Sequence, residues 1–174
     1  MVDKLDGMDE KQDVYIGLGS NIGDRKKNLD LAIYELEKAF SCKAKCSKVF
    51  QTEAWGFVTK DLFLNCCVII QTDFPPEQVL SVTQSIEKKL GRVKKSKNNS
   101  YESRVIDLDI LYYGELILNS ENLIIPHPLI YDRIFVITTI VDVNPAFIDP
   151  VKNMCISQLL NTCNDEKSVL LYEQ

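Results

Sequence analysis

The sequence has few of the residues from which metal and nucleic-acid sites are commonly built. Its 174 residues include one histidine, and none of its six cysteines forms a CxxC pair, which argues against a zinc site. The net charge of −5 argues against a general nucleic-acid binder, because such proteins are usually basic. The apolar runs fall far short of the roughly 20 residues that a membrane-spanning helix needs, so we expect no membrane segment.

The N-terminus lacks the charged-then-apolar pattern and small-residue cleavage site of a signal peptide. Cysteines without a disulfide pattern are typical of a reducing compartment, and we expect a cytoplasmic protein. With 45% hydrophobic and 26% charged residues, the composition is that of an ordinary globular chain. We predict a flexible N-terminal extension over residues 1–12, a single domain over residues 13–174, and a monomer.

The pattern of apolar residues predicts an α+β fold. Strand and helix patterns follow one another in the order β-α-β-β-α-β, which is typical of a ferredoxin-like core with an antiparallel sheet. The strand-like segments are 13–20, 42–55, 63–73 and 104–113, and the helical segments are 25–40 and 76–90. C-terminal additions follow: a proline-punctuated segment, an apolar run at 134–143, a short helix near 156–162 and a last strand at 168–172.

The segment GLGSNIGDRKKN places glycines at positions 17, 19 and 23 between a strand and a helix. A dinucleotide-binding fingerprint would need a glycine where Ile22 stands, and no Gly-Lys-Ser/Thr follows as a P-loop requires. A tight strand-to-helix turn accounts for the segment, with Ser20, Asn21 or Asp24 capping the helix.

Two aspartates interrupt an apolar strand in the segment SRVIDLDILYYGE. Asp107 and Asp109 share one face because side chains alternate along a strand, and they stand roughly 7 Å apart. Two carboxylates at this distance repel each other, but they suit hard cations such as Mg²⁺, which keeps water and phosphate oxygens among its ligands. The alternative interpretation is the solvated face of an edge strand.

Basic and polar residues suggest a partner for these carboxylates. Arg104 precedes them, and Arg92 opens a lysine-rich loop that includes Lys94, a pattern that suits a phosphorylated ligand bound with a metal. A solvated basic loop is the alternative. His127 lies between two prolines that restrict the backbone, and without further context a hydrogen-bonded turn histidine is the favoured interpretation. Asn65 falls in an apolar strand, where its amide needs partners.

Four segments, YIGLGSNIGDRKKNL, LGRVKK, SRVIDLDILYYGE and IPHPLIYDRIFV, stand in an order and at spacings that resemble the 6-hydroxymethyl-7,8-dihydropterin pyrophosphokinase family of folate biosynthesis. The resemblance covers about residues 13–150. It implies a ferredoxin-like α+β core and the transfer of pyrophosphate from ATP to the hydroxymethyl group of the pterin, with release of AMP. It also implies two magnesium ions, ATP as co-substrate, and small molecules as the partners.

The resemblance further implies a set of site residues. Asp107 and Asp109 would hold the magnesium ions, and Arg92 and Arg104 would act with them in catalysis. The residues implied for ATP binding are Gln84, Glu87, Lys94, His127 and Arg133. The residues implied for pterin binding are Thr52, Trp55, Phe63, Asn65 and Phe135, with Phe135 stacking on the ring.

Two loops depart from the family pattern. TEAWG stands where the family often has Pro-Pro-x-Gly, and Tyr-Glu-Ser-Arg at 101–104 stands where it often has Trp-Gly-Pro-Arg. These departures leave the contacts of Trp55 and Tyr101 open. The role of residues 150–174 is also open, apart from a strand that would complete the fold.

Two other functions are compatible with parts of this pattern. One is a metal-dependent kinase that moves only the γ-phosphate of ATP, which would release ADP rather than AMP. The other is a ferredoxin-like nucleotide-binding module without catalysis. A binding module has no need of two metal-ligating carboxylates beside arginines, so the pattern favours an enzyme. The resemblance implies an ATP-dependent diphosphokinase, and the product, AMP or ADP, distinguishes it from a γ-phosphate kinase.

Overall fold

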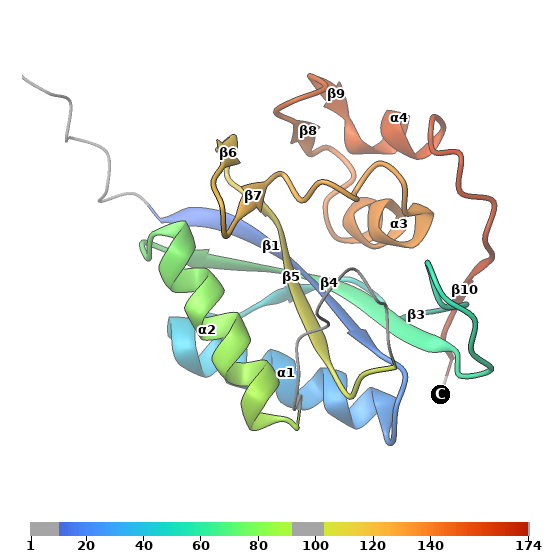
Figure 1. The fold of residues 1–174 in the computed structure, drawn as a ribbon. Coiled ribbons are helices and arrows are strands. Elements are labelled where there is room, and N and C mark those ends of the chain that lie inside the picture. Colours follow the sequence, from blue (N-terminus) through green and yellow to red (C-terminus); the bar gives the residue numbers. More distant parts are fainter. Residues whose placement is uncertain (1–10, 92–102, 174) are drawn as a thin grey trace, which may run out of the picture.

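The centre of the fold is one antiparallel sheet, seen in a computed structural model that describes residues 11–91 and 103–173 (Figure 1). The strand order is β10-β3-β4-β1-β5, and β2 also pairs with β4. The bounds are β1 (Gln12–Ser20), β2 (Lys45–Cys46), β3 (Phe50–Thr52), β4 (Phe63–Thr72), β5 (Asp107–Tyr113) and β10 (Val169–Leu171). The order β3-β4-β1-β5 confirms the predicted ferredoxin-like core. Most of the predicted N-terminal extension and of the basic loop lies outside the described residues.

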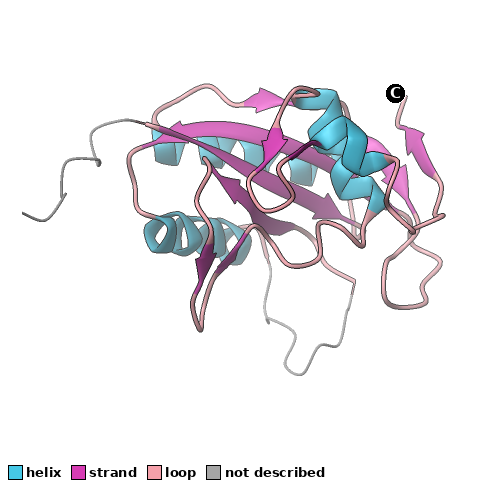
Figure 2. Ribbon diagram, turned by 90° about the horizontal axis from the view of Figure 1, so that it is seen from above, coloured by secondary structure: helices cyan, strands magenta, loops and turns pink. Residues whose placement is uncertain are grey.

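Helices cover both faces of the sheet (Figure 1, Figure 2). The predicted first two helices are confirmed as α1 (Arg25–Phe40) and α2 (Pro76–Lys89), which lie together on one face. The opposite face carries α3 (Ile134–Val143), formed by the apolar run, and the short α4 (Ile156–Leu160). A separate cluster of buried side chains packs on each face. The short hairpins are β6 (Leu118–Asn119) with β7 (Ile124–Ile125), and β8 (Ile148–Asp149) with β9 (Met154–Cys155).

The continuous strand predicted over residues 42–55 is wrong, because the chain forms two short strands with a β-bulge between them. The register advances by four residues from Cys46 to Phe50 but by only three along β4. Ser47 lies in this bulge, and its hydroxyl accepts a hydrogen bond from the Cys67 backbone N–H at 2.9 Å. A side-chain oxygen thus takes the place of a backbone acceptor, an exchange that residue periodicity does not reveal.

None of the helices within residues 11–91 and 103–173 is long and apolar enough to cross a membrane.

A buried carboxylate ties β5 to the C-terminal additions. Asp149 is fully buried and accepts hydrogen bonds from the hydroxyls of Tyr112 (2.6 Å) and Tyr131 (2.9 Å). It also accepts from the backbone N–H groups of Val151 (2.9 Å) and Lys152 (2.6 Å). Burial, reinforced by the hydrogen bond to this carboxylate, raises the pKa of both tyrosines, so both hydroxyls stay protonated and act as donors.

We expect Asp149→Ala to lower the free energy of unfolding by about 2–4 kcal/mol, because its four donors lose their acceptor. Asp30→Ala is a suitable control, since exposed Asp30 forms an i,i+4 ion pair with Lys26 at 2.6 Å, an interaction worth about 0.2–0.5 kcal/mol. Urea unfolding followed by circular dichroism measures both variants. Similar losses from the two substitutions would contradict the structural role of Asp149.

Candidate functional site

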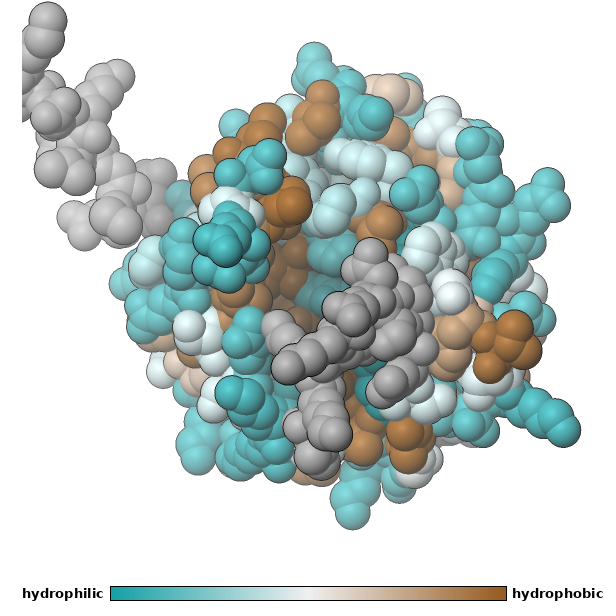
Figure 3. Space-filling view, in the orientation of Figure 1, coloured by the Kyte–Doolittle hydropathy of each residue, from teal (hydrophilic) through white to brown (hydrophobic). Residues whose placement is uncertain are grey.

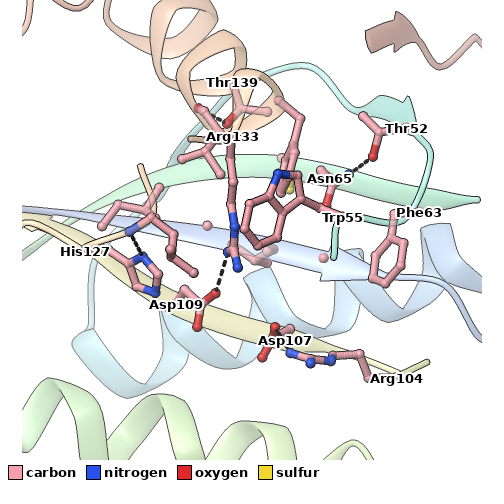
Figure 4. A pocket seen from close by; sticks show the side chains of 18 of the residues that line it. Thr52, Trp55, Phe63, Asn65, Arg104, Asp107, Asp109, His127, Arg133 and Thr139 are labelled. Carbon is pink, nitrogen blue, oxygen red and sulfur yellow. Dashed lines mark hydrogen bonds and ion pairs between the residues drawn. The ribbon is translucent and has the colours of Figure 1, made fainter. Parts of the chain in front are cut away.

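The two aspartates of β5 point toward the side of the sheet that carries α3 (Figure 4). Leu108 between them points the other way, into the buried cluster under α1 and α2. On the neighbouring strand β1, Gly19 pairs with Asp107 and Gly17 pairs with Asp109. Paired residues of an antiparallel sheet project to the same face, and both glycines line the pocket beside the carboxylates. The absence of a side chain at Gly17 makes room for Leu111, whose side chain would stand 3.3 Å from a Cβ atom there.

This pocket has a volume of about 230 Å³ and joins a charged end to an aromatic end. In the space-filling view the surface is hollowed where hydrophobic (brown) and hydrophilic (teal) side chains meet (Figure 3). The predicted site residues that line the pocket are Thr52, Trp55, Phe63, Asn65, Arg104, Asp107, Asp109, His127, Arg133 and Phe135. The structure therefore brings together residues from β3, β4, β5 and the start of α3 that lie far apart in the sequence.

Among the described residues, each carboxylate of the pair lies beside a guanidinium group. Arg104 forms an ion pair with Asp107, and Nη1 of Arg133 lies 4.0 Å from the nearer carboxylate oxygen of Asp109 (Figure 4). The side chains of Arg104, Asp107 and Arg133 are 11–17% exposed, which strengthens their electrostatic interactions relative to surface pairs. The two arginines thus compensate the repulsion between two like charges on one strand.

A set of hydrogen bonds holds the segment that carries Arg104. The Ser20 hydroxyl donates to the Val105 carbonyl at 2.6 Å, and Asn28 Nδ2 donates to the same carbonyl at 3.1 Å. Asn21 Oδ1 accepts from the Arg104 backbone N–H at 2.7 Å. We call Ser20, Asn21 and Asn28 the latch.

Of the three polar residues expected to cap α1, one caps the helix and two belong to the latch. The cap comes from Asp24, whose side chain accepts from Lys27 N at 3.1 Å, so one of the three predicted capping residues is confirmed. Ser20 and Asn21 hold a distant segment instead. The sequence signal for this role was a cluster of polar side chains around a tight turn. That signal does not identify the distant segment to which Ser20 and Asn21 bind.

The aromatic end has one fixed amide. Asn65 is 5% exposed, and its Nδ2 donates to the Thr52 hydroxyl at 2.8 Å. A Cβ atom at Gly19 would stand 3.0 Å from Asn65 Oδ1 and 3.7 Å from the Phe63 ring, so the amide oxygen faces the open space that this glycine leaves. Phe135 lines the same pocket from the first turn of α3.

Trp55 covers the junction between the two ends. The Arg133 guanidinium lies 4.6 Å from the centre of the Trp55 ring, which is a cation–π arrangement. The indole N–H donates to the Asp132 carbonyl at 3.1 Å, which fixes the ring over the chain that leads into α3. The contact of Trp55 left open by the sequence is therefore one with Arg133.

His127 is neutral and keeps its proton on Nε2. Its Nδ1 accepts a hydrogen bond from the Leu129 backbone N–H at 3.2 Å, so the proton must be on the other ring nitrogen (Figure 4). Burial, assisted by the positive charge of Arg133 and partly opposed by Asp107, lowers the pKa of His127 from 6.5 to about 4. The imidazole can thus donate a hydrogen bond to an anion without carrying a charge.

Four predicted site residues are not among the described residues that line the pocket. Arg92 and Lys94 lie outside the described residues. Gln84 is half-buried on α2, and Glu87 is buried there with its carboxylate accepting from the Leu108 backbone N–H at 2.8 Å. That bond links α2 to the strand that bears the two aspartates.

The donor set is compatible with magnesium but not with a metal bound by protein side chains alone. Within residues 11–91 and 103–173, no cluster of three or more His, Cys, Asp or Glu side chains could hold a metal ion. Asp107 and Asp109 provide two carboxylates on a half-exposed edge of the pocket. Mg²⁺ commonly binds to one or two carboxylates and takes its other ligands from water and substrate phosphates.

Known proteins resemble the chain in both sequence and fold. The family model described as 7,8-dihydro-6-hydroxymethylpterin-pyrophosphokinase (HPPK) matches residues 15–145. The 2-amino-4-hydroxy-6-hydroxymethyldihydropteridine pyrophosphokinase of Porphyromonas gingivalis is 38% identical over 76% of this chain and 90% of its own length. The protein of the same name from Bacillus subtilis is 38% identical over 74% of this chain and 76% of its own length.

Longer proteins also contain a matching region. The folic acid synthesis protein fol1 of Pneumocystis carinii is 38% identical over 85% of this chain, which spans only 20% of that protein. A crystal structure of a Plasmodium falciparum HPPK-DHPS triple mutant matches with a TM-score of 0.70 at 16% identity, over 90% of this chain and 42% of that one. At this identity, the solved structure supports the fold alone.

We predict that the single imidazole titrates near pH 4 and carries its proton on Nε2, because burial and Arg133 both oppose a positive charge. In the unfolded chain it would titrate near 6.5, so its contribution to stability is complete above that pH and is lost as the pH falls toward 4. Proton–nitrogen NMR correlation spectra resolve the tautomer and the titration without assignment, since the chain has one histidine. A pKa at or above 6.5, or a proton on Nδ1, would contradict the described environment.

Proposed function

The chain belongs to the 7,8-dihydro-6-hydroxymethylpterin-pyrophosphokinase family, and we propose that it transfers pyrophosphate from ATP to 6-hydroxymethyl-7,8-dihydropterin, releasing AMP, in folate biosynthesis. The observation that carries this proposal is a single pocket in which an aromatic, amide-bearing end adjoins a paired set of aspartates and arginines. A planar heterocycle and a polyphosphate need these two chemistries side by side. The single domain would extend over residues 13–174 and act as a cytoplasmic monomer, consistent with six free cysteines.

The aromatic end suits the pterin. The ring would lie flat against Phe135, with Phe63 on its other side or at its edge. Asn65 Oδ1 would accept hydrogen bonds from the N–H groups of the ring, since the bond from Nδ2 to Thr52 fixes the orientation of the amide. The open space beside Gly19 gives the ring access to that oxygen.

The charged end suits a nucleotide polyphosphate and magnesium. Two Mg²⁺ ions held by Asp107 and Asp109 would neutralise phosphate charge and align the attacking and leaving oxygens. Neutral His127 would add an Nε2–H donor to a phosphate oxygen. Arg92 and Lys94 are proposed for the same phosphates, and Gln84 and Glu87 for the nucleotide side of α2.

The observed ion pairs suggest that the arginines change partners when the nucleotide binds. Arg104 and Arg133 compensate the carboxylates in the structure described. Cations brought in with the nucleotide would satisfy the carboxylates, which frees both guanidinium groups to bind phosphate oxygens in their preferred bidentate geometry. The site would thereby stay close to electroneutral in both states.

The chemistry then requires positioning more than proton transfer. The hydroxymethyl oxygen of the pterin attacks the β-phosphorus of ATP in line with the oxygen that leads to AMP. A bond forms from the hydroxymethyl oxygen to the β-phosphorus, and the bond from the β-phosphorus to the oxygen that stays on AMP breaks. The hydroxyl proton passes to solvent. Arg104 and Arg133 would stabilise the negative charge that develops on the transferred group and on AMP. The pocket would hold the two substrates next to each other, so that positioning contributes to the rate.

The adenine product tests the proposed reaction. Purified protein incubated with ATP, magnesium and 6-hydroxymethyl-7,8-dihydropterin should form AMP only when the pterin is present, and chromatography separates the nucleotides. Formation of ADP would place the attack on the γ-phosphorus and identify a different kinase. A folded protein that turns over no nucleotide would leave a binding module as the function.

Asp107→Asn and Asp109→Asn should each lower pterin-dependent AMP formation by about 10²–10³-fold, because an amide binds magnesium poorly and contributes no negative charge. Each variant keeps the shape of the side chain, and its thermal unfolding should stay close to that of the parent protein. Asp30→Asn, at an exposed position on α1, is the control and should retain full activity. Full magnesium-dependent turnover by either β5 variant would show that its carboxylate is not a metal ligand.

Gly19→Ala should weaken pterin binding about tenfold, because the added methyl group would stand 3.0 Å from Asn65 Oδ1 and displace the amide. Titration calorimetry with the pterin measures the loss. The affinity for a non-hydrolysable ATP analogue is the internal control and should change less than twofold. A pterin affinity equal to that of the parent protein would place the pterin elsewhere in the pocket.

A further inference from the structure

The last part of the described chain runs from α4 back to the sheet and joins its edge beside β3 (Figure 1). We call residues 163–171 the strap. It lies beyond residues 15–145, the part of the chain that the family model matches. The strap contacts two walls of the pocket, the start of α3 through Asp165 and the Thr52–Trp55 segment through Lys167 and Val169.

The first contact supplies what the N-terminus of α3 lacks. Arg133 occupies the N-cap position without a capping side-chain hydrogen bond, and the first turn of α3 contains no acidic residue. Asp165 Oδ2 accepts a hydrogen bond from the Ile134 backbone N–H at 3.1 Å, and its Oδ1 accepts from Lys167 N at 3.2 Å. A carboxylate from the strap therefore caps α3 from a distance.

The identity of the N-cap residue explains why the cap is remote. A capping residue is normally Ser, Thr, Asp or Asn, with a short side chain that folds back on the helix. The long side chain of Arg133 instead extends into the pocket, to Trp55 and Asp109. The strap thus accepts the hydrogen bond of a free N–H group at the start of α3. The N-cap residue itself, Arg133, can therefore place its side chain in the pocket.

The second contact holds the wall that contains Thr52 and Trp55. The Lys167 ammonium group donates a hydrogen bond to the carbonyl of Ala54, a 5% exposed residue directly before Trp55. Two residues further along the strap, Val169 pairs with Thr52 in the sheet. Thr52 in turn accepts the hydrogen bond that orients Asn65.

We propose that Asp165 and Lys167 are positioning residues for pterin binding, and that the strap, together with the direct contacts of Trp55 with Asp132 and Arg133, sets how the Thr52–Trp55 wall lies against the wall formed by the first turn of α3. This inference rests on the proposed function, because it assigns the pterin to the space between those walls. Neither residue lines the pocket. Asp165 acts through the backbone N–H of Ile134, and Lys167 acts through the carbonyl of Ala54. Each of these backbone groups belongs to a residue next to one whose side chain lines the pocket.

The test compares Asp165→Ala and Lys167→Ala with Glu166→Ala, which removes a charge from the exposed position between them. The first two variants should raise the KM for the pterin about tenfold, while the KM for ATP should change less than twofold. Glu166→Ala should change neither constant. Asp165→Asn keeps one acceptor oxygen of the two in use, so it should recover part of the pterin affinity.

A second measurement follows the wall directly. Trp55 is the single tryptophan of the chain, so its emission wavelength and anisotropy report on the residue that follows Ala54. Lys167→Ala should shift the emission to the red and lower the anisotropy at a temperature well below thermal unfolding. Glu166→Ala should leave both unchanged. This readout does not depend on turnover.

The outcomes separate the strap from the proposed function. If the parent protein forms no pterin-dependent AMP, the proposed function fails, and the Trp55 signal still tests the strap. If the parent protein is active but Asp165→Ala and Lys167→Ala keep the parental KM and Trp55 emission, the inference about the strap is overturned. An equal rise in both KM values would also overturn it. Should Asp165→Ala fail to fold, Asp165→Asn and Lys167→Ala carry the test.

Discussion

The arrangement of the pocket depends on one electrostatic constraint, which is that two carboxylates on the same face of β5 must be compensated. Asp107 faces Arg104 and Asp109 faces Arg133, so each negative charge has a positive one beside it. The two arginines come from separate segments, and each segment is anchored by other parts of the chain. The latch around Ser20 holds the first, and the start of α3 carries the second. The hydrogen bonds of the latch thus hold the backbone that carries the Arg104 guanidinium group.

Glycines of β1 border the carboxylates. Gly17 and Gly19 stand opposite the aspartates and line the pocket, and a Cβ atom at these positions would meet the Leu111 side chain at 3.3 Å and Asn65 Oδ1 at 3.0 Å, respectively. The aromatic end of the pocket begins directly beyond Gly19, at Asn65 and Phe63. Under the proposed function, this adjacency places the hydroxymethyl group of a pterin close to the phosphates of ATP.

Local sequence signals predicted much of the fold and part of the site. Alternating and helical apolar patterns gave the ferredoxin-like order, and the spacing of Asp107 and Asp109 placed both on one face. The features that escaped prediction depend on pairing between distant segments. The glycines of β1 were assigned to a turn, because the register that sets them opposite the aspartates is a tertiary property. The β-bulge at Ser47 and the remote cap from Asp165 likewise require a partner that no local pattern identifies.

If the arginines balance the carboxylates until a nucleotide arrives with its metal, the protein alone should bind the metal weakly. Mn²⁺ accepts the same oxygen ligands as Mg²⁺, and its paramagnetic resonance signal distinguishes free from bound ions. We expect weak Mn²⁺ binding to the protein alone and at least tenfold tighter binding in the presence of a non-hydrolysable ATP analogue, beyond the affinity of the analogue itself. Equally tight binding without the nucleotide would show that the arginines do not compete with the metal for Asp107 and Asp109.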